Sequence, residues 1–200
     1  MKKGTVFVWL LLLLSGIIAL FWHNDWVYNL PTPVPAHYQA VGQGQYINLP
    51  KEVRAEPNKP VFLHFFNPSC PCSRFNIPHF KSLVAQYGSS MSFAIVVQSY
   101  KKYSVEEIQQ KFGLDIPVLS DTSIAAACGV YSTPQAVIID TSRHLFYRGN
   151  YNKTRYCADK KTEYARIAID ELLRGNMHAS FDPLATKAFG CQLPVCTRQD

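Results

Sequence analysis

Residues 65–80 read FFNPSCPCSRFNIPHF, and this stretch decides the fold that the chain is expected to adopt. The apolar run Pro60–Phe66 leads into it and is typical of a buried central strand. Apolar residues then recur at near-helical spacing over Ser73–Tyr87. The stretch therefore predicts a strand, a short loop that carries Cys70 and Cys72, and a helix.

Further elements are expected on the C-terminal side of this stretch. Strands are predicted at 91–98, 135–140 and 145–151, and helices at 104–113 and 161–174. A short segment is expected at 116–119, followed by a short helix at 122–128 that Asp121 caps. On the N-terminal side, residues 38–49 are expected to form a strand or hairpin. Ser104 and Glu107 form a capping box in the sequence. Alternating strands and helices predict parallel pairing, and the final pair of strands adds antiparallel neighbours. The fold class is α/β, with a central mixed sheet flanked by helices.

The N-terminus carries an apolar run, residues 6–22, preceded by the Lys2–Lys3 pair. No small residues with the spacing of a cleavage site follow closely, and the bulky Trp26 and Tyr28 stand there instead. Aromatic residues at this point are typical of the interfacial belt of a membrane helix. We expect an uncleaved signal anchor rather than a cleaved signal peptide, with the lysine pair on the cytoplasmic side.

This anchor divides the chain into four parts. Residues 1–29 are the cytoplasmic tip and transmembrane helix, 30–37 a proline-rich linker, 38–178 the folded domain, and 179–200 a tail that contains cysteines. Proline at alternate positions favours an extended linker that spaces the domain from the membrane. In a bacterium the domain then lies in the periplasm, attached to the inner membrane by a single pass.

Charge and cysteine content bound the function. The formal net charge is +6, but the basic residues form no long run, so nucleic-acid binding is not expected. Six cysteines suit an exported protein with disulfides, although six allow fifteen pairings.

The strand, the loop with Cys70 and the following helix resemble the thioredoxin fold, and the likeness covers about 60–174. Pro78 falls where the active-site helix of that family commonly carries a kinking proline. VYSTPQAVIID, residues 130–140, is similar to the family's cis-proline loop and its next strand. Residues 148–173 also resemble bacterial thioredoxin-like proteins of uncharacterised function.

Cys70 is the candidate nucleophile. At the first turn of a helix, unpaired N–H groups and the positive end of the dipole stabilise a thiolate. The pKa of such a thiol falls below its ordinary value. Pro71 suits the first helical position because it has no N–H to leave unpaired.

Cys72 departs from the family's Cys-x-x-Cys pattern, because Ser73 stands at the fourth position. Residues two apart on a helix point to nearly opposite faces, so a Cys70–Cys72 bridge would be strained and easily reduced. Cys72 as the resolving thiol is one reading, and Cys70 as a monothiol is another. A third is Cu(I) binding by both cysteines with His79 or His64 nearby. The remaining alternative is that both cysteines are buried packing residues with no chemical role.

Three further residues are candidates through the resemblance. The family often has a buried carboxylate at the position of His64, where it is thought to move protons for the second cysteine; the alternative is a core histidine. A cis Pro134 would place the Thr133 backbone beside Cys70, where it can pair with an extended substrate peptide. An ordinary turn proline is the alternative there.

The other cysteines are assigned structural roles. Cys128 is expected to be a small core residue. A bridge from Cys157 to Cys191 or Cys196, or a local Cys191–Cys196 loop, would pin the tail to the domain.

The function expected is that of an enzyme, a thioredoxin-like protein-disulfide oxidoreductase that acts on exported proteins through Cys70. It needs no cofactor and implies a membrane redox partner that the sequence does not identify. A copper chaperone or assembly factor that uses Cys70 and Cys72 is the alternative. A thiol peroxidase ranks lower, because Asn67 stands where peroxiredoxins place a threonine. A redox-inert interaction module ranks lowest.

Overall fold

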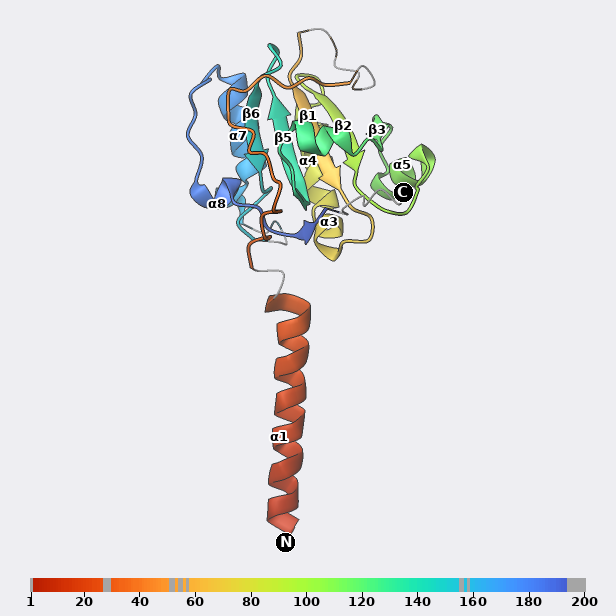
Figure 1. Ribbon diagram of the computed structural model, residues 1–200, viewed down its shortest axis with the longest axis vertical. Helices are drawn as coiled ribbons and strands as arrows, with labels where there is room; N and C mark the ends of the chain where they lie inside the picture. Colours follow the sequence, from red (N-terminus) through yellow and green to blue (C-terminus); the bar gives the residue numbers. More distant parts are fainter. Residues whose placement is uncertain are drawn as a thin grey trace.

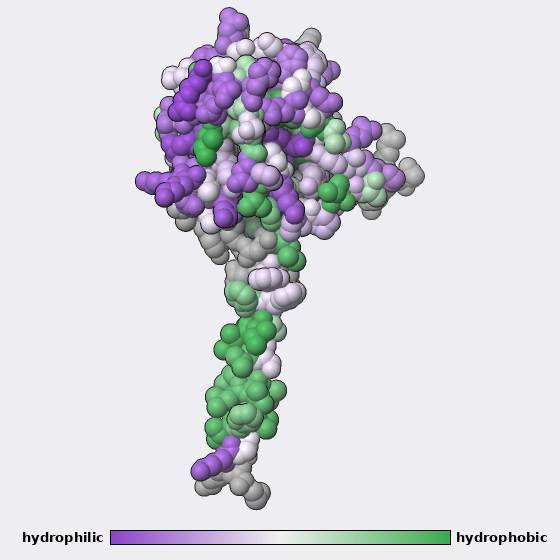
Figure 2. Space-filling model, turned by 90° about the vertical axis from the view of Figure 1, so that its left-hand side faces the viewer, coloured by the Kyte–Doolittle hydropathy of each residue, from purple (hydrophilic) through white to green (hydrophobic). Residues whose placement is uncertain are grey.

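The computed structural model describes residues 2–26, 30–50, 53, 56, 58–154, 157 and 159–193. A long N-terminal helix, α1 (Lys2–Phe21), extends away from an α/β domain and continues into a π-helical turn, η1 (Trp22–Trp26) (Figure 1). The stretch Lys3–Phe21 is long and apolar enough to cross a membrane, a property that a signal sequence shares. Its side chains are exposed all round, and Figure 2 shows them as a continuous apolar surface below a largely polar domain.

The domain is built on a five-stranded sheet in the order β3-β2-β1-β5-β6. The strands are β1 (Val61–Phe66), β2 (Ser92–Val97), β3 (Val118–Leu119), β5 (Gln135–Ile139) and β6 (Leu145–Gly149). β1, β2 and β3 run parallel, whereas β5 is antiparallel to both β1 and β6. The mixed sheet and thioredoxin-like fold expected from the sequence are thereby confirmed.

Helices cover both faces of this sheet. One core cluster joins the sheet to α4 (Ile77–Tyr87), α5 (Val105–Phe112) and α7 (Tyr164–Leu173). The other face packs on α6 (Ser123–Ala127) and on the segment around Ile47. The remaining short elements are α3 (Pro71–Phe75), β4 (Ser132–Thr133), η2 (Lys160–Thr162), α8 (Pro183–Thr186) and β7 (Cys191–Gln192).

The burial of both faces of the central strand β1 explains why its sequence is an apolar run. Phe62 and Phe66 belong to the first core cluster, and Leu63 and Phe65 belong to the second. Because both faces of the sheet are covered, every residue of β1 is buried, and no alternation with polar residues is needed.

The segment 38–49 and the helix after Cys70 differ from what the sequence predicted. Residues 38–49 form no strand or hairpin; Tyr46 makes a single bridge to His144. The helix expected over 73–87 is broken at Asn76 into α3 and α4. Pro78 lies in the first turn of α4, where its missing N–H costs no helical hydrogen bond, so the break precedes the proline.

The N-terminal cap of α5 matches the prediction from the sequence, whereas that of α6 does not. The capping box of α5 is confirmed, because the Ser104 hydroxyl accepts from the Glu107 N–H and the Glu107 side chain accepts from the Ser104 N–H. The cap of α6 is Thr122 rather than Asp121. The Asp121 carboxylate still accepts a hydrogen bond, from the Ser123 N–H.

Candidate functional site

Cys70 lies between the end of β1 and the start of α3, as the N-cap of that helix. Its backbone is extended (φ −85°, ψ 122°), and Pro71 opens the helical turn. The Cys70 N–H donates to the Asn67 carbonyl at 3.0 Å, and the Ser69 N–H donates to the Asn67 side chain at 2.9 Å. This tight loop sets the cysteine sulfur at the mouth of the helix.

Ser73 holds the same loop from the helix side. Its hydroxyl is buried and accepts a hydrogen bond from the Asn67 N–H at 3.2 Å. The residue at the fourth position of the motif therefore braces the loop that carries Cys70.

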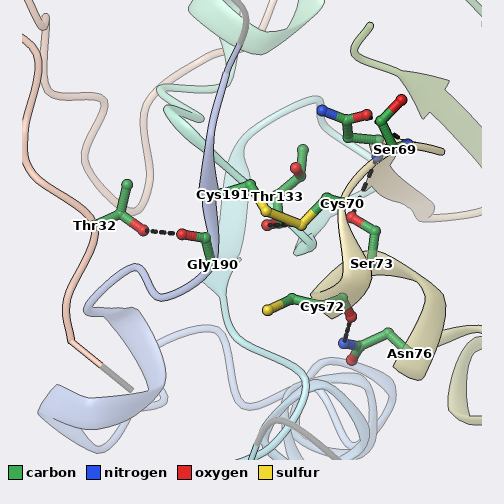
Figure 3. The surroundings of a disulfide bond; sticks show 10 residues. Thr32, Ser69, Cys70, Cys72, Ser73, Asn76, Thr133, Gly190 and Cys191 are labelled. Atoms are coloured by element: carbon green, nitrogen blue, oxygen red, sulfur yellow. Dashed lines mark hydrogen bonds between the residues drawn. A yellow bond between two sulfur atoms is a disulfide. The ribbon is translucent and has the colours of Figure 1, made fainter. Parts of the chain in front are cut away.

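The loop before β5 lies against Cys70. The Thr133–Pro134 peptide bond is cis, as the sequence resemblance implied. The Thr133 carbonyl oxygen lies 3.8 Å from the Cys70 sulfur (Figure 3). The backbone of Thr133 is thus next to the candidate nucleophile.

Cys70 forms a disulfide with Cys191, across 121 residues of chain, with 6.2 Å between the Cα atoms. The sequence predicted that Cys191 would pair with Cys157 or with Cys196, and this disulfide shows that both predictions for Cys191 were wrong. Cys157 is a free thiol in the structure, and Cys196 lies outside the described residues, as does Tyr28. The physical reason is that the tail returns to the cis-proline loop.

That return is a strand pairing. β7 runs antiparallel to β4, with Cys191 opposite Thr133 and Gln192 opposite Ser132. The Leu193 N–H donates to the Tyr131 carbonyl at 3.2 Å and extends the pairing by one more residue. The disulfide and the strand pairing therefore hold the same short stretch of tail, residues 191–193.

The linker from α1 holds the tail on its other side. The Thr32 hydroxyl donates to the Gly190 carbonyl at 3.1 Å, and the Thr32 N–H donates to the Ala188 carbonyl at 2.9 Å. Pro31 forms a bridge with Phe189. Figure 3 shows the order across the site, from Thr32 through the tail to Cys70. The linker is therefore packed on the domain and is more than a spacer.

Cys72 does not take part in this disulfide. Its side chain is buried, and its carbonyl accepts from the Asn76 side chain at 3.0 Å. Figure 3 shows its sulfur apart from the Cys70–Cys191 bond. Cys72 lines a small cavity of about 90 Å³ together with Pro134, Tyr151 and others. The strained Cys70–Cys72 bridge is absent from this structure because the helical turn separates residues two apart.

His64 is fully buried on β1, with its ring stacked on Phe80 at a centroid distance of 4.6 Å. Burial lowers the pKa of His64 to about 3, so the ring is neutral at neutral pH. Its Nδ1 shares a 2.6 Å hydrogen bond with the Tyr151 hydroxyl, whose pKa burial raises well above its ordinary value. The structure joins His64 to the Cys72 cavity through Tyr151.

The remaining thiols are in apolar surroundings. Burial raises the pKa of Cys128 to about 12 and, with a smaller contribution from Glu163, raises the pKa of Cys157 to about 12. The Cys157 thiol donates to the Asn76 side chain at 3.1 Å. Both groups are protonated at neutral pH, and Cys128 fits the core role expected for it.

The alternative metal site gains no support from this geometry. His79 is buried on α4, with its ring 5.7 Å from that of Tyr151. Within the part of the chain that the structure describes, no group of three or more His, Cys, Asp or Glu side chains is arranged to hold a metal ion. Copper binding by Cys70, Cys72 and His79 would first require reduction of the Cys70–Cys191 bond.

Comparison with known families adds one assignment. A family model described as domain of unknown function DUF6436 matches residues 38–195. The chain belongs to the DUF6436 family. None of the curated proteins compared with the chain matches its sequence.

Solved structures share the fold of this DUF6436 protein at low sequence identity. An uncharacterized conserved protein from Geobacillus kaustophilus is 20% identical, with a TM-score of 0.61 and coverage of 81% of this chain and 97% of that one. A hypothetical protein from Sinorhizobium meliloti 1021 is 17% identical, with a TM-score of 0.59 and coverage of 78% and 95%. A thioredoxin-family thiol:disulfide interchange protein from Chlorobium tepidum TLS is 15% identical, with a TM-score of 0.49 and coverage of 67% and 99%. The first two show the fold and nothing further.

The pairing of Cys191 with Cys70 is the feature of the site that the sequence did not reveal. Cys191 is preceded by Gly190, whose φ of +131° brings its backbone against Thr133. A glycine directly before a tail cysteine was the available signal, since such a glycine permits close backbone approach. The signal was too weak to choose among the possible partners of Cys191.

Proposed function

We propose that this DUF6436 protein is a membrane-anchored thiol-disulfide oxidoreductase that exchanges disulfides with exported proteins through Cys70. The observation that carries the proposal is the disulfide at Cys70, formed at a helix mouth and against the Thr133 backbone. Redox chemistry needs a sulfur that both forms and releases such a bond.

The reactive form is the Cys70 thiolate that remains after the disulfide is reduced. Pro71, the first residue of α3, has no N–H. The first N–H groups at the N-terminal end of α3, next to Cys70, therefore belong to Cys72 and Ser73. These groups and the helix dipole favour the thiolate over the thiol. A thiolate at this position attacks one sulfur of a client disulfide and forms a mixed disulfide.

The proposed cellular location rests on α1. We infer that α1 is a single-pass anchor in the inner membrane, with the domain in the periplasm. Trp22 and Trp26 stack at a centroid distance of 5.7 Å at the end of α1, where an interfacial belt would lie. The electron donor or acceptor would then be a membrane protein whose redox-active thiols reach the same compartment.

The test is the Cys70→Ser variant of the full chain in detergent, assayed for reduction of insulin disulfides by dithiothreitol. We expect exchange to fall by at least about 100-fold, since the serine hydroxyl is not ionised at neutral pH and forms no disulfide. Cys128→Ser is the matched control and should retain wild-type exchange. Undiminished exchange in Cys70→Ser would overturn the proposal.

A further inference from the structure

The tail occupies the edge of the cis-proline loop that an extended client would need. β7 pairs antiparallel with β4, and Cys191 lies opposite Thr133, at the sulfur of Cys70. Main-chain pairing of an extended segment on a free strand edge is a general mode of peptide recognition. The tail is therefore arranged as a client strand in mixed disulfide with Cys70 would be.

This arrangement closes the site in the oxidised protein. The exposed fraction of Cys70 is 2%, and Ser132 and Thr133 are fully buried. Gly190 lies directly over the loop, and a Cβ added there would clash with the Thr133 carbonyl oxygen. A client strand and the tail cannot both pair with Ser132–Thr133, so the two must compete for that edge.

We propose that Cys191 is the resolving cysteine of Cys70, and that the segment Phe189–Leu193 is an intramolecular client strand that displaces the bound client as it resolves it. This inference rests on the proposed function of Cys70. The client class that it implies is an extended polypeptide segment whose disulfide-bonded cysteine lies opposite Thr133.

The chemistry balances in two exchange steps. The Cys70 thiolate attacks a client disulfide, forms a mixed disulfide, and releases the second client sulfur as a thiolate that takes up a proton. The Cys191 thiol, after losing its proton, attacks the Cys70 sulfur; the bond to the client breaks and its electron pair leaves on the client sulfur, which is then protonated. The client gains two electrons and two protons, and Cys70 and Cys191 lose them. Oxidation of a client dithiol is the same sequence in reverse.

The first experiment traps the mixed disulfide. The reduced full chain in detergent is mixed with an equal amount of insulin, quenched with acid, and analysed by mass spectrometry. Cys191→Ser should accumulate the Cys70–insulin adduct to at least about ten times the wild-type level, because the attack that removes it is lost. Cys72→Ser and Cys196→Ser are matched controls and should show the wild-type level.

The outcomes separate this inference from the function on which it rests. Accumulation in Cys72→Ser or Cys196→Ser, with none in Cys191→Ser, would overturn the role of Cys191 while leaving Cys70 as the nucleophile. Absence of reaction with insulin in the wild-type protein would remove the proposed function and this inference with it.

A second experiment keeps all six cysteines and disturbs only the fit of the tail. Gly190→Ala adds a methyl group that would clash with the Thr133 carbonyl oxygen, whereas Gly175→Ala, also at positive φ (+81°), meets nothing within 4 Å. In a glutathione redox buffer, Gly190→Ala should lower the equilibrium constant for the Cys70–Cys191 bond by at least about tenfold. Gly175→Ala should change it less than about twofold. An unchanged equilibrium constant in Gly190→Ala would show that the Cys70–Cys191 bond does not depend on the pairing of the tail with Ser132–Thr133.

Discussion

Cys70 and Cys128 are a natural comparison, because both are buried cysteines at the ends of five-residue helices. Cys70 is the N-cap of α3, and Cys128 is the C-cap of α6. The N-terminal end presents N–H groups that favour a thiolate, whereas the C-terminal end presents carbonyl groups that disfavour it. The exposed fractions, 2% and 0%, hardly differ. With Cys70 as the proposed nucleophile, the two buried sulfurs differ in the helix end that they meet and in whether a partner strand reaches them.

The largest expected effect is a difference in alkylation rate between these two cysteines. In the fully reduced protein at pH 7, Cys70 should react with iodoacetamide at least about 1000 times faster than Cys128, since a thiol with a pKa of about 12 is ionised in only about one molecule in 100,000. Peptide mass mapping over time measures both rates. Similar alkylation rates at Cys70 and Cys128 would contradict the proposed difference in reactivity between the two thiols.

A second buried group, His64, extends the comparison to the interior of the domain. Its pKa is about 3 in the folded state, below the ordinary value of 6.5, so the unfolded state binds more protons between these limits. Stability from this group is complete above pH 6.5 and is lost as the pH falls below it. Between pH 8 and pH 5 the free energy of unfolding should fall by about 2 kcal/mol. His79, whose pKa burial also lowers, adds in the same direction.

Urea unfolding of residues 30–200, which carry both core clusters, measures this dependence. His64→Leu should remove most of the fall between pH 8 and pH 5. Phe80→Leu, which removes the ring stacked on His64 but no titrating group, should lower stability at both pH values and keep the difference between them. An unchanged pH dependence in His64→Leu would contradict the neutral, buried state of this histidine.

The smallest effect concerns Ser73, on the same turn as Cys70. Ser73→Ala should lower the free energy of unfolding by about 1 kcal/mol, because the Asn67 N–H loses its acceptor. Removal of the Cys70–insulin adduct should keep its wild-type rate, since Ser73 braces a loop and does not resolve the mixed disulfide. Ser104→Ala, at the distant cap of α5, is the control and should cost a similar amount. A slower removal of the adduct in Ser73→Ala alone would give this residue a chemical role.

The sequence was sufficient for the parts of the fold that rest on local patterns. Strands buried on both faces are apolar runs, as in β1 and β2, and the Ser104–Glu107 capping box marks the start of α5. The loop with Cys70 and the cis Pro134 followed from short motifs and their resemblance to a known family. These features depend on residues that are close together in the chain.

The pairing of the tail could not be derived in this way. β4 and β7 each have two residues, too few to show a periodicity, and 121 residues separate the bonded cysteines. The pairing also depends on Thr32 in the linker, far from both strands in sequence. The absent hairpin at 38–49 has a related cause, because this segment takes its backbone partners from elsewhere in the chain: the Ile47 N–H donates to the Arg143 carbonyl in the turn before β6, and the Gly44 N–H donates to the Leu145 carbonyl at the start of β6.

The contact between linker and tail also bears on where the proposed reaction would take place. Five chain steps lead from Trp26, at the end of η1, to Pro31, which bridges to Phe189 in the tail. Such a segment spans at most about 18 Å. With α1 in the membrane, as proposed, the exchange site is tethered close to the bilayer surface. A redox partner in the same bilayer would be confined to the same surface layer as this site, whereas freely diffusing thiols would be spread through the whole volume of the compartment.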